Sequence, residues 1–508
     1  ISEFRNCSLK VTAGQFFFLF VLAKVIGIFV ISSFFALVFI VFSSSAMMYL
    51  TGLGTVGTEY LFYTLIGQNS FLNLLKYINI FYILDGGEFF GSYLNLNIFS
   101  NAVTSVPIVF AVFGTVFLLC TMFSCTLFCK CNQQKTAGIF SRLFEKFKSK
   151  FYTLNGSTSI FKGEFYKFTV QNKMAVMIGL LVLFAIISSF GTVRYPYSEI
   201  SDADYKAYME YLEGDITVEK ENYMLEQQNY FDDLRQRLDE IAENSELSEN
   251  AKQAMSKSIE NILNSKGIAF ERVNEQYNRL LEINEKGVDA RFVDENIYKS
   301  FVSSKTREWN DFALLCLVLV IGVPYVFSPE YKNGMINLIR PTKNGKTKLF
   351  HRKITVQFTY LLIAFISLYM PYFVRFINTY GVNSLNTPLV CMFENVQITP
   401  FSVINAVVIN LICYFLLATA VTFIITAVSI FTRNNMFTMV ISTVLIIIPW
   451  LALYSIENAR IGYWVVNYHS VVVAIVCLLS IFIAIVALEI SKFKFTETRI
   501  WRRINAKA

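Results

Sequence analysis

Few residues in this chain have the types and spacing that catalysis or metal binding requires. The two histidines, His351 and His469, lie far apart in the sequence, so they favour neither a metal site nor an acid–base pair. No Ser/His/Asp nucleophile set is evident. Cys125, Cys129 and Cys131 are closely spaced, but no further Cys or His completes a zinc ligand set nearby. We therefore expect a protein that is not an enzyme and binds no metal.

One tripeptide, Gly345 to Thr347, ends like a phosphate-binding loop. Arg340 stands where the first Gly of such a loop is needed, and no apolar strand precedes it. The sequence holds no other Gly-x-x-x-x-Gly-Lys-Ser/Thr pattern. We therefore expect no ATP hydrolysis by this chain and no cofactor bound to it.

Two ionisable residues, Lys24 and Glu59, stand within apolar runs and away from their ends. Charges inside a membrane usually face a cavity or a partner. Either residue could line a translocation path, or the two could pair. A third interpretation is that Lys24 extends its ammonium group to the membrane interface.

The composition indicates a polytopic membrane protein. The chain has 508 residues, of which 55% are apolar and 16% charged, and its mean hydropathy is +0.49. Soluble domains carry about 25% charged residues, so an ordinary cytosolic enzyme is excluded. Abundant Phe with little Pro and Gly also excludes collagen-like and disordered chains.

Nine runs are long enough to cross a bilayer, which needs about 20 apolar residues of helix. The second is the weakest, because three Gly and Glu59 interrupt it. The predicted spans are 14–46, 50–67, 103–129, 174–193, 312–328, 354–374, 401–431, 436–453 and 470–491.

Basic residues gather in three segments, 130–173, 329–353 and the tail 492–508, which are therefore predicted to be cytoplasmic. Since they flank spans, we expect no nucleic-acid binding. The alternation of cytoplasmic and outer segments leaves residues 1–13 outside with an odd number of spans, so we expect upstream spans to be missing.

The sequence of residues 159–173 is typical of an interfacial helix that enters the membrane or of an ordinary basic linker.

The long polar stretch, 194–310, carries 15 basic and 25 acidic residues and is predicted to be extracytoplasmic. Apolar residues at helical spacing form two stripes, 224–241 and 255–280, separated by a polar break with Ser248 as a helix N-cap. This pattern predicts an antiparallel helical hairpin, or coiled coil, after a short helix over 202–213. Its acidic charge suits a collector for cationic substrates, or simply a solvated surface.

The segment from Phe327 to Lys353 resembles the signature of ABC type-2 transporter permeases. It has an acid after a span, Glu330, then Gly334, a short apolar helix and a Thr/Gly/Lys-rich turn. The resemblance covers 159–491, a six-span unit. Residues 14–129 are similar to the last three spans of a preceding unit, which implies a tandem permease whose first three spans are missing here.

The resemblance implies an all-α polytopic permease of an ABC exporter in the bacterial plasma membrane. A separate nucleotide-binding subunit, in two copies, would bind ATP and Mg²⁺ and drive export of an amphipathic peptide or lipid-like substrate. Membrane lipid and a second permease chain or second copy are the other expected partners. The ATPase-coupling residues implied are Glu330, Gly334, Met335, Ile336, Leu338, Ile339 and Arg340.

The predicted organisation follows from these spans and segments. It comprises three upstream spans (1–129), a linker with an elbow helix (130–173), a first span (174–193), the acidic helical domain (194–310), five further spans with the coupling loop 329–353 (311–491), and the basic tail (492–508). A different class of function stays open, in which a membrane-anchored sensor or scaffold uses the hairpin to bind a partner.

Overall fold

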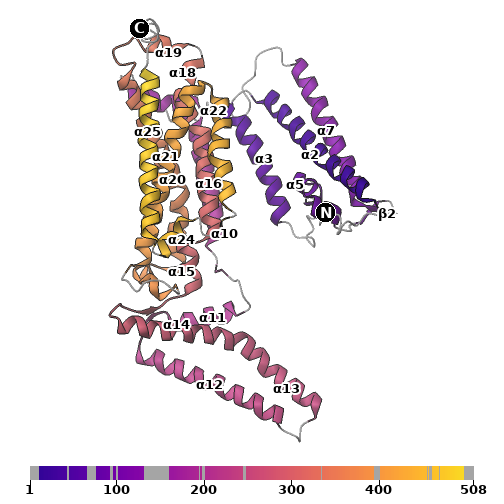
Figure 1. Ribbon diagram of the computed structural model, residues 1–508, viewed down its shortest axis with the longest axis vertical. Coiled ribbons are helices and arrows are strands. Elements are labelled where there is room, and N and C mark those ends of the chain that lie inside the picture. The colour runs from indigo at the N-terminus through magenta and orange to yellow at the C-terminus, as the bar shows by residue number, and fades with distance from the viewer. Residues whose placement is uncertain are drawn as a thin grey trace. The chain divides into compact units, whose positions relative to one another are not determined.

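The computed structural model describes residues 11–42, 45–65, 76–91, 95–98, 101–130, 159–193, 195–196, 201–243, 248–332, 334–393, 401–454, 456, 460–467 and 469–496. The chain divides into two compact units, residues 1–155 and 156–508. Each is described below by itself, with element labels as in Figure 1.

The protein is predominantly helical, and its long apolar helices fit a polytopic membrane protein. Among the described residues, seven helices or helical runs are long and apolar enough to cross a membrane. They are Ala13–Val41, Ser105–Cys129, Glu295–Tyr331, Thr347–Tyr380, Val403–Thr432, Asn435–Leu453 and Ser470–Thr496. An eighth is present if Ile160–Gln171 and Met174–Phe190, bent by 64°, form one broken span. The weakest predicted span, 50–67, is helical over its described part, which ends at Leu65, but does not reach the hydropathy of these seven.

The first unit is built on two long apolar helices that lie side by side, α2 (Ala13–Val41) and α7 (Ser105–Lys130). Thr12 and Gln15 form a capping box at the start of α2. Aromatic side chains fill the core, where the Phe89 and Phe90 rings meet edge to face. The remaining elements are α3 (Ser45–Leu65), α5 (Ile80–Leu84), α6 (Gly86–Gly91) and an antiparallel pair, β1 (Asn95–Ile98) with β2 (Asn101–Thr104).

The second unit contains a helical bundle (Figure 1). Its long helices are α10 (Met174–Thr192), α16 (Lys305–Gly322), α20 (Thr347–Tyr380), α21 (Val403–Thr432) and α25 (Ser470–Thr496). The span 435–453 consists of α22 (Asn435–Ser442), a π-helical turn η5 (Thr443–Ile447) and α23 (Ile448–Leu453). The span around α16 is the most buried, and α21 and α25 pack along each other.

Shorter elements connect the bundle helices. They are α9 (Ile160–Tyr166), η1 (Lys167–Gln171), α15 (Glu295–Val302), α17 (Pro324–Phe327), α18 (Pro329–Lys332), α19 (Met335–Ile339), η3 (Asn383–Asn386), η4 (Leu389–Cys391) and α24 (Ile461–Val466). Pro324 and Pro329 each begin a helix, which explains why the helical run after α16 is broken into short pieces. The helix formed by α9 and η1 is bent by 64° from α10.

Residues 201–293 fold as a helical domain, and the predicted hairpin is present in it. Its elements are α11 (Asp202–Leu212), β3 (Gly214–Asp215), α12 (Val218–Glu243), α13 (Glu249–Ile262), the π-helical η2 (Leu263–Gly267), α14 (Ile268–Glu285) and β4 (Arg291–Phe292). Ser248 caps α13 as predicted. Phe231 of one arm stacks on Phe270 of the other. Met255, predicted in the second stripe, is exposed instead.

Candidate functional site

The predicted coupling segment lies between α17 and α20, at the end of the bundle opposite the helical domain (Figure 1). Gly334 caps α19 with a φ of +67°, a left-handed conformation that favours glycine. A Cβ atom at Gly345 would overlap the carbonyl oxygen of Ile339. The Gly-Lys-Thr sequence therefore has a steric role, because its glycine lets the turn after α19 close against that helix.

A buried ion cluster holds the start of this segment. The Nζ atom of Lys353, in α20, lies 2.6 Å from Glu164 Oε2 in α9 and 2.8 Å from Glu330 Oε1 in α18. It also donates a 2.6 Å hydrogen bond to the carbonyl oxygen of Val326. Lys353 is 1% exposed, and both carboxylates are buried. One ammonium group therefore ties three helices together.

Lys167 of η1 completes the cluster from its exposed side. Its Nζ atom lies 2.7 Å from Glu164 Oε1 and 3.9 Å from Glu330 Oε1. Two carboxylates thus face two ammonium groups, and the cluster is electrically balanced. Such balance is what a buried charge needs, since an unpaired one is strongly unfavourable.

The short helix α19 divides its side chains between two faces. Ile336 is buried, whereas Met335 is 48% and Leu338 76% exposed. Ile339 is partly buried. The helix thus presents two large apolar side chains to the outside, while Ile336 faces inward.

The end of α19 is tied to the end of α25. Arg340 Nη2 donates to the carbonyl oxygen of Lys494 over 3.5 Å, and its guanidinium lies 5.8 Å from the centre of the Phe495 ring. Phe495 is fully buried against Phe327. The predicted residues therefore separate into anchors, which are Glu330, Gly334, Ile336 and Arg340, and an exposed pair, Met335 and Leu338.

Lys24 and Glu59, predicted to pair or to line a path, bind opposite ends of one short helix. Lys24 Nζ donates to the carbonyl oxygen of Leu84, at the end of α5. Glu59 Oε2 accepts from the backbone N–H of Ile80, at its start, over 3.2 Å. A base at the C-terminus and an acid at the N-terminus complement the helix dipole. The two side chains do not pair with each other, because the whole of α5 separates their binding points.

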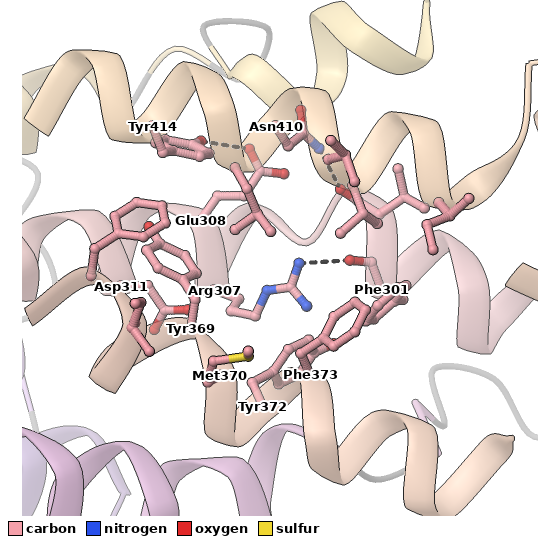
Figure 2. Close-up of a pocket in the computed structure, with 17 residues that line it drawn as sticks. Phe301, Arg307, Glu308, Asp311, Tyr369, Met370, Tyr372, Phe373, Asn410 and Tyr414 are labelled. Carbon is pink, nitrogen blue, oxygen red and sulfur yellow. Dashed lines mark hydrogen bonds between the residues drawn. The ribbon is translucent and has the colours of Figure 1, made fainter. Parts of the chain in front are cut away.

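The bundle also contains a cavity of about 330 Å³ between α16, α20 and α21 (Figure 2). Its wall is largely apolar, and three ionisable side chains from the first turns of α16 line it: Arg307, Glu308 and Asp311. In Figure 2 the Arg307 guanidinium extends toward the middle of the cavity. The volume lies at the lower end of the range for small-molecule sites.

Sequence reasoning missed several of these residues. Glu164 lies within the basic segment 130–173, and nothing in the sequence places it beside Lys353. Arg307 and Glu308 fell into the predicted polar stretch ending at 310, whereas the helix that carries them begins at Lys305 and continues into the span. A charged turn directly before an apolar run is the signal that could have found them.

Comparison of the chain with protein-family models, with curated proteins and with solved structures gave no match.

Proposed function

We propose that this chain is the membrane-spanning subunit of an ATP-driven exporter in a bacterial plasma membrane. A separate nucleotide-binding subunit would supply the energy, and the cargo would be an amphipathic peptide or lipid-like molecule. The observation that carries the proposal is the α19 segment, which exposes Met335 and Leu338 while buried contacts fix both of its ends.

The anchors explain how motion could pass from α19 to the spans. Glu330 joins α18 to α9 and α20 through Lys353, and Arg340 joins the other end to α25. Ser328 adds a buried 2.7 Å hydrogen bond between its Oγ atom and that of Ser429 in α21. A push on the exposed side chains would therefore reach four helices through short, rigid connections. Apolar side chains on a short helix are a common means of seating in a groove of a partner.

The charge pattern supports the sidedness that this function needs. The basic segments 130–173, 329–353 and 492–508 favour a cytoplasmic position for α19, where an ATPase would meet it. The acidic helical domain lies at the opposite end of the bundle (Figure 1). Under this proposal it is extracytoplasmic.

Co-purification tests the proposal directly. The chain is expressed with the genes adjacent to its own, and Leu338→Asp is compared with Leu225→Asp, a matched control in α12 whose leucine is 66% exposed. We expect an ATPase subunit to co-purify with the native chain and with Leu225→Asp, and to be lost with Leu338→Asp. Retention with Leu338→Asp would exclude α19 as the docking element.

If no ATPase subunit associates with the native chain, the exporter proposal is wrong. The helical domain then becomes the place to look for a binding partner, as in a membrane-anchored sensor or scaffold.

A further inference from the structure

The cavity between α16, α20 and α21 contains a buried hydrogen-bond donor without a partner. Arg307 Nη2 donates a 2.6 Å hydrogen bond to the carbonyl oxygen of Phe301, and the guanidinium stacks 4.1 Å from the centre of the Tyr372 ring. Its Nη1 atom is buried and has no hydrogen-bond partner among the described residues. Since arginine stays charged, this nitrogen is suited to an oxyanion.

Unpartnered acceptors belong to two residues that line the same cavity, Glu308 and Asn410; the Glu308 carboxylate packs against Gly462. Glu308 Oε2 accepts from the Tyr414 hydroxyl over 2.8 Å and from the Gly462 backbone N–H over 3.1 Å. Its Oε1 atom is buried and finds no donor in the described part of the chain. Asn410 donates to the carbonyl oxygen of Val302, which leaves its buried Oδ1 atom without a donor as well.

Arg307 Nη1, Glu308 Oε1 and Asn410 Oδ1 do not form hydrogen bonds with one another. Among the described residues no ion pair joins Arg307 to Glu308 or Asp311, although the Arg307 charge acts on both carboxylates. In the described part of the chain, three buried atoms of the cavity lining therefore lack hydrogen-bond partners: Arg307 Nη1, Glu308 Oε1 and Asn410 Oδ1. A ligand that matches the donor and the two acceptors must carry an anionic oxygen and, a short distance away, a group with several N–H donors.

The rest of the cavity is apolar and reaches the outside of the bundle between α20 and α21. Ile366, Met370 and Val408 line it and are also about half exposed, Met370 at 52%. In a membrane-spanning bundle these side chains face lipid. The opening therefore leads from the polar groups to the outside of the bundle, and the polar groups lie in the first turns of α16.

We propose that this cavity binds the headgroup and upper acyl chain of a phospholipid with a primary ammonium group, of the phosphatidylethanolamine class. The phosphate would bind Arg307 Nη1, and the ammonium would donate to Glu308 Oε1 and Asn410 Oδ1. A quaternary ammonium has no N–H to donate, and phosphatidylglycerol has no cation. Binding itself does not depend on transport; only a role for this lipid as cargo rests on the proposed function.

Native mass spectrometry of the full chain, purified in detergent without an ATPase, tests this site. Dioleoyl phosphatidylethanolamine, phosphatidylcholine and phosphatidylglycerol are added at equal concentration. We expect one tightly bound lipid, with phosphatidylethanolamine preferred about tenfold, the effect of losing one charge-assisted hydrogen bond. Arg307→Gln should abolish the preference, whereas Arg375→Gln, the same change in α20 outside the cavity, should keep it.

A second variant keeps the test decisive if Arg307→Gln does not fold. Met370→Trp adds a ring at the opening of the cavity and leaves its polar groups unchanged, so it should lower occupancy by all three lipids. Equal binding of the three lipids by the native chain, or a preference that survives both Arg307→Gln and Met370→Trp, would overturn the proposal. Because no ATPase is present, neither result bears on α19 as a docking element.

Discussion

Both units of this molecule place charges among apolar helices, but they use them differently. In the first unit, Lys24 and Glu59 each bind the backbone, at opposite ends of α5. In the second, Lys353, Glu164 and Glu330 bind one another across α20, α9 and α18. Charges that cap one short helix stabilise that helix alone. Charges that join three helices hold those helices to one another.

The two units should also differ in how much free energy of unfolding is lost when one charged residue is removed. A side chain that binds a backbone carbonyl contributes about 1.5–3 kcal/mol when it is charged. Removing one member of a buried ion pair costs about 3–5 kcal/mol, because it leaves an uncompensated charge. We therefore expect the second unit to be the more sensitive to a single charge removal.

The largest effect is expected from Lys353→Met. It leaves Glu164 and Glu330 buried without their shared partner, and should lower the free energy of unfolding by about 3–5 kcal/mol. Thermal unfolding in detergent measures this, with Lys348→Met as the control, since Lys348 is exposed in the same helix. Equal melting temperatures for the two variants would show that the cluster does not hold the helices.

Lys24→Met should have a smaller effect. It removes the hydrogen bond to the carbonyl of Leu84 and should destabilise the protein by about 1.5–3 kcal/mol. Measured by the same melting experiment, this variant should lie between Lys348→Met and Lys353→Met. A loss greater than that of Lys353→Met would reverse the comparison of the two units.

A pH series extends the comparison to Asp294, a buried acid that follows the helical domain and caps α15. Burial raises the pKa of this carboxyl to about 6. Because the pKa of Asp294 is higher in the folded than in the unfolded chain, its protonated carboxyl favours folding. This contribution to the free energy of unfolding is fully present below pH about 4 and is lost as the pH rises through 6. Relative to Asp294→Asn, the native chain should lose up to about 1.4 kcal/mol per pH unit in that window. A difference that does not change with pH would contradict this.

The smallest expected effect is a coupling energy between two charged residues, and it should differ between the two units. In a double-mutant cycle, Lys353→Met with Glu330→Gln should be non-additive by at least about 1 kcal/mol, because the residues touch. Lys24→Met with Glu59→Gln should be additive to within about 0.5 kcal/mol. Comparable coupling energies in both cycles would mean that Lys24 and Glu59 are coupled through α5 as strongly as two residues in direct contact.

Local signals in the sequence predicted much of the fold. Hydropathy located the long helices, the apolar stripes located the hairpin arms, and Ser248 marked a helix start. Glu330 and Gly334 were singled out only by the resemblance to the permease signature, and their coupling role stays a prediction. Contacts between distant segments could not be predicted in this way: Lys353 and Glu164 are 189 residues apart, and neither carries a local sign of the other.

The cavity was missed for a different physical reason. Charged residues next to an apolar run look like the end of the preceding polar stretch. Composition does not reveal that one helix continues from the polar stretch into the apolar run. Arg307 and Glu308 are charged and yet lie within a helix that enters the bundle, with Glu308 buried against Tyr414.

ATP turnover by the detergent-purified complex tests the central claim most directly. The chain is co-expressed with its neighbouring genes, with residues 330–340 either native or scrambled, and with Leu225→Asp as the control. The account predicts ATP turnover only when a partner subunit is present, retained in Leu225→Asp and lost or uncoupled from substrate in the scrambled chain. Turnover with unchanged substrate response after scrambling would contradict it.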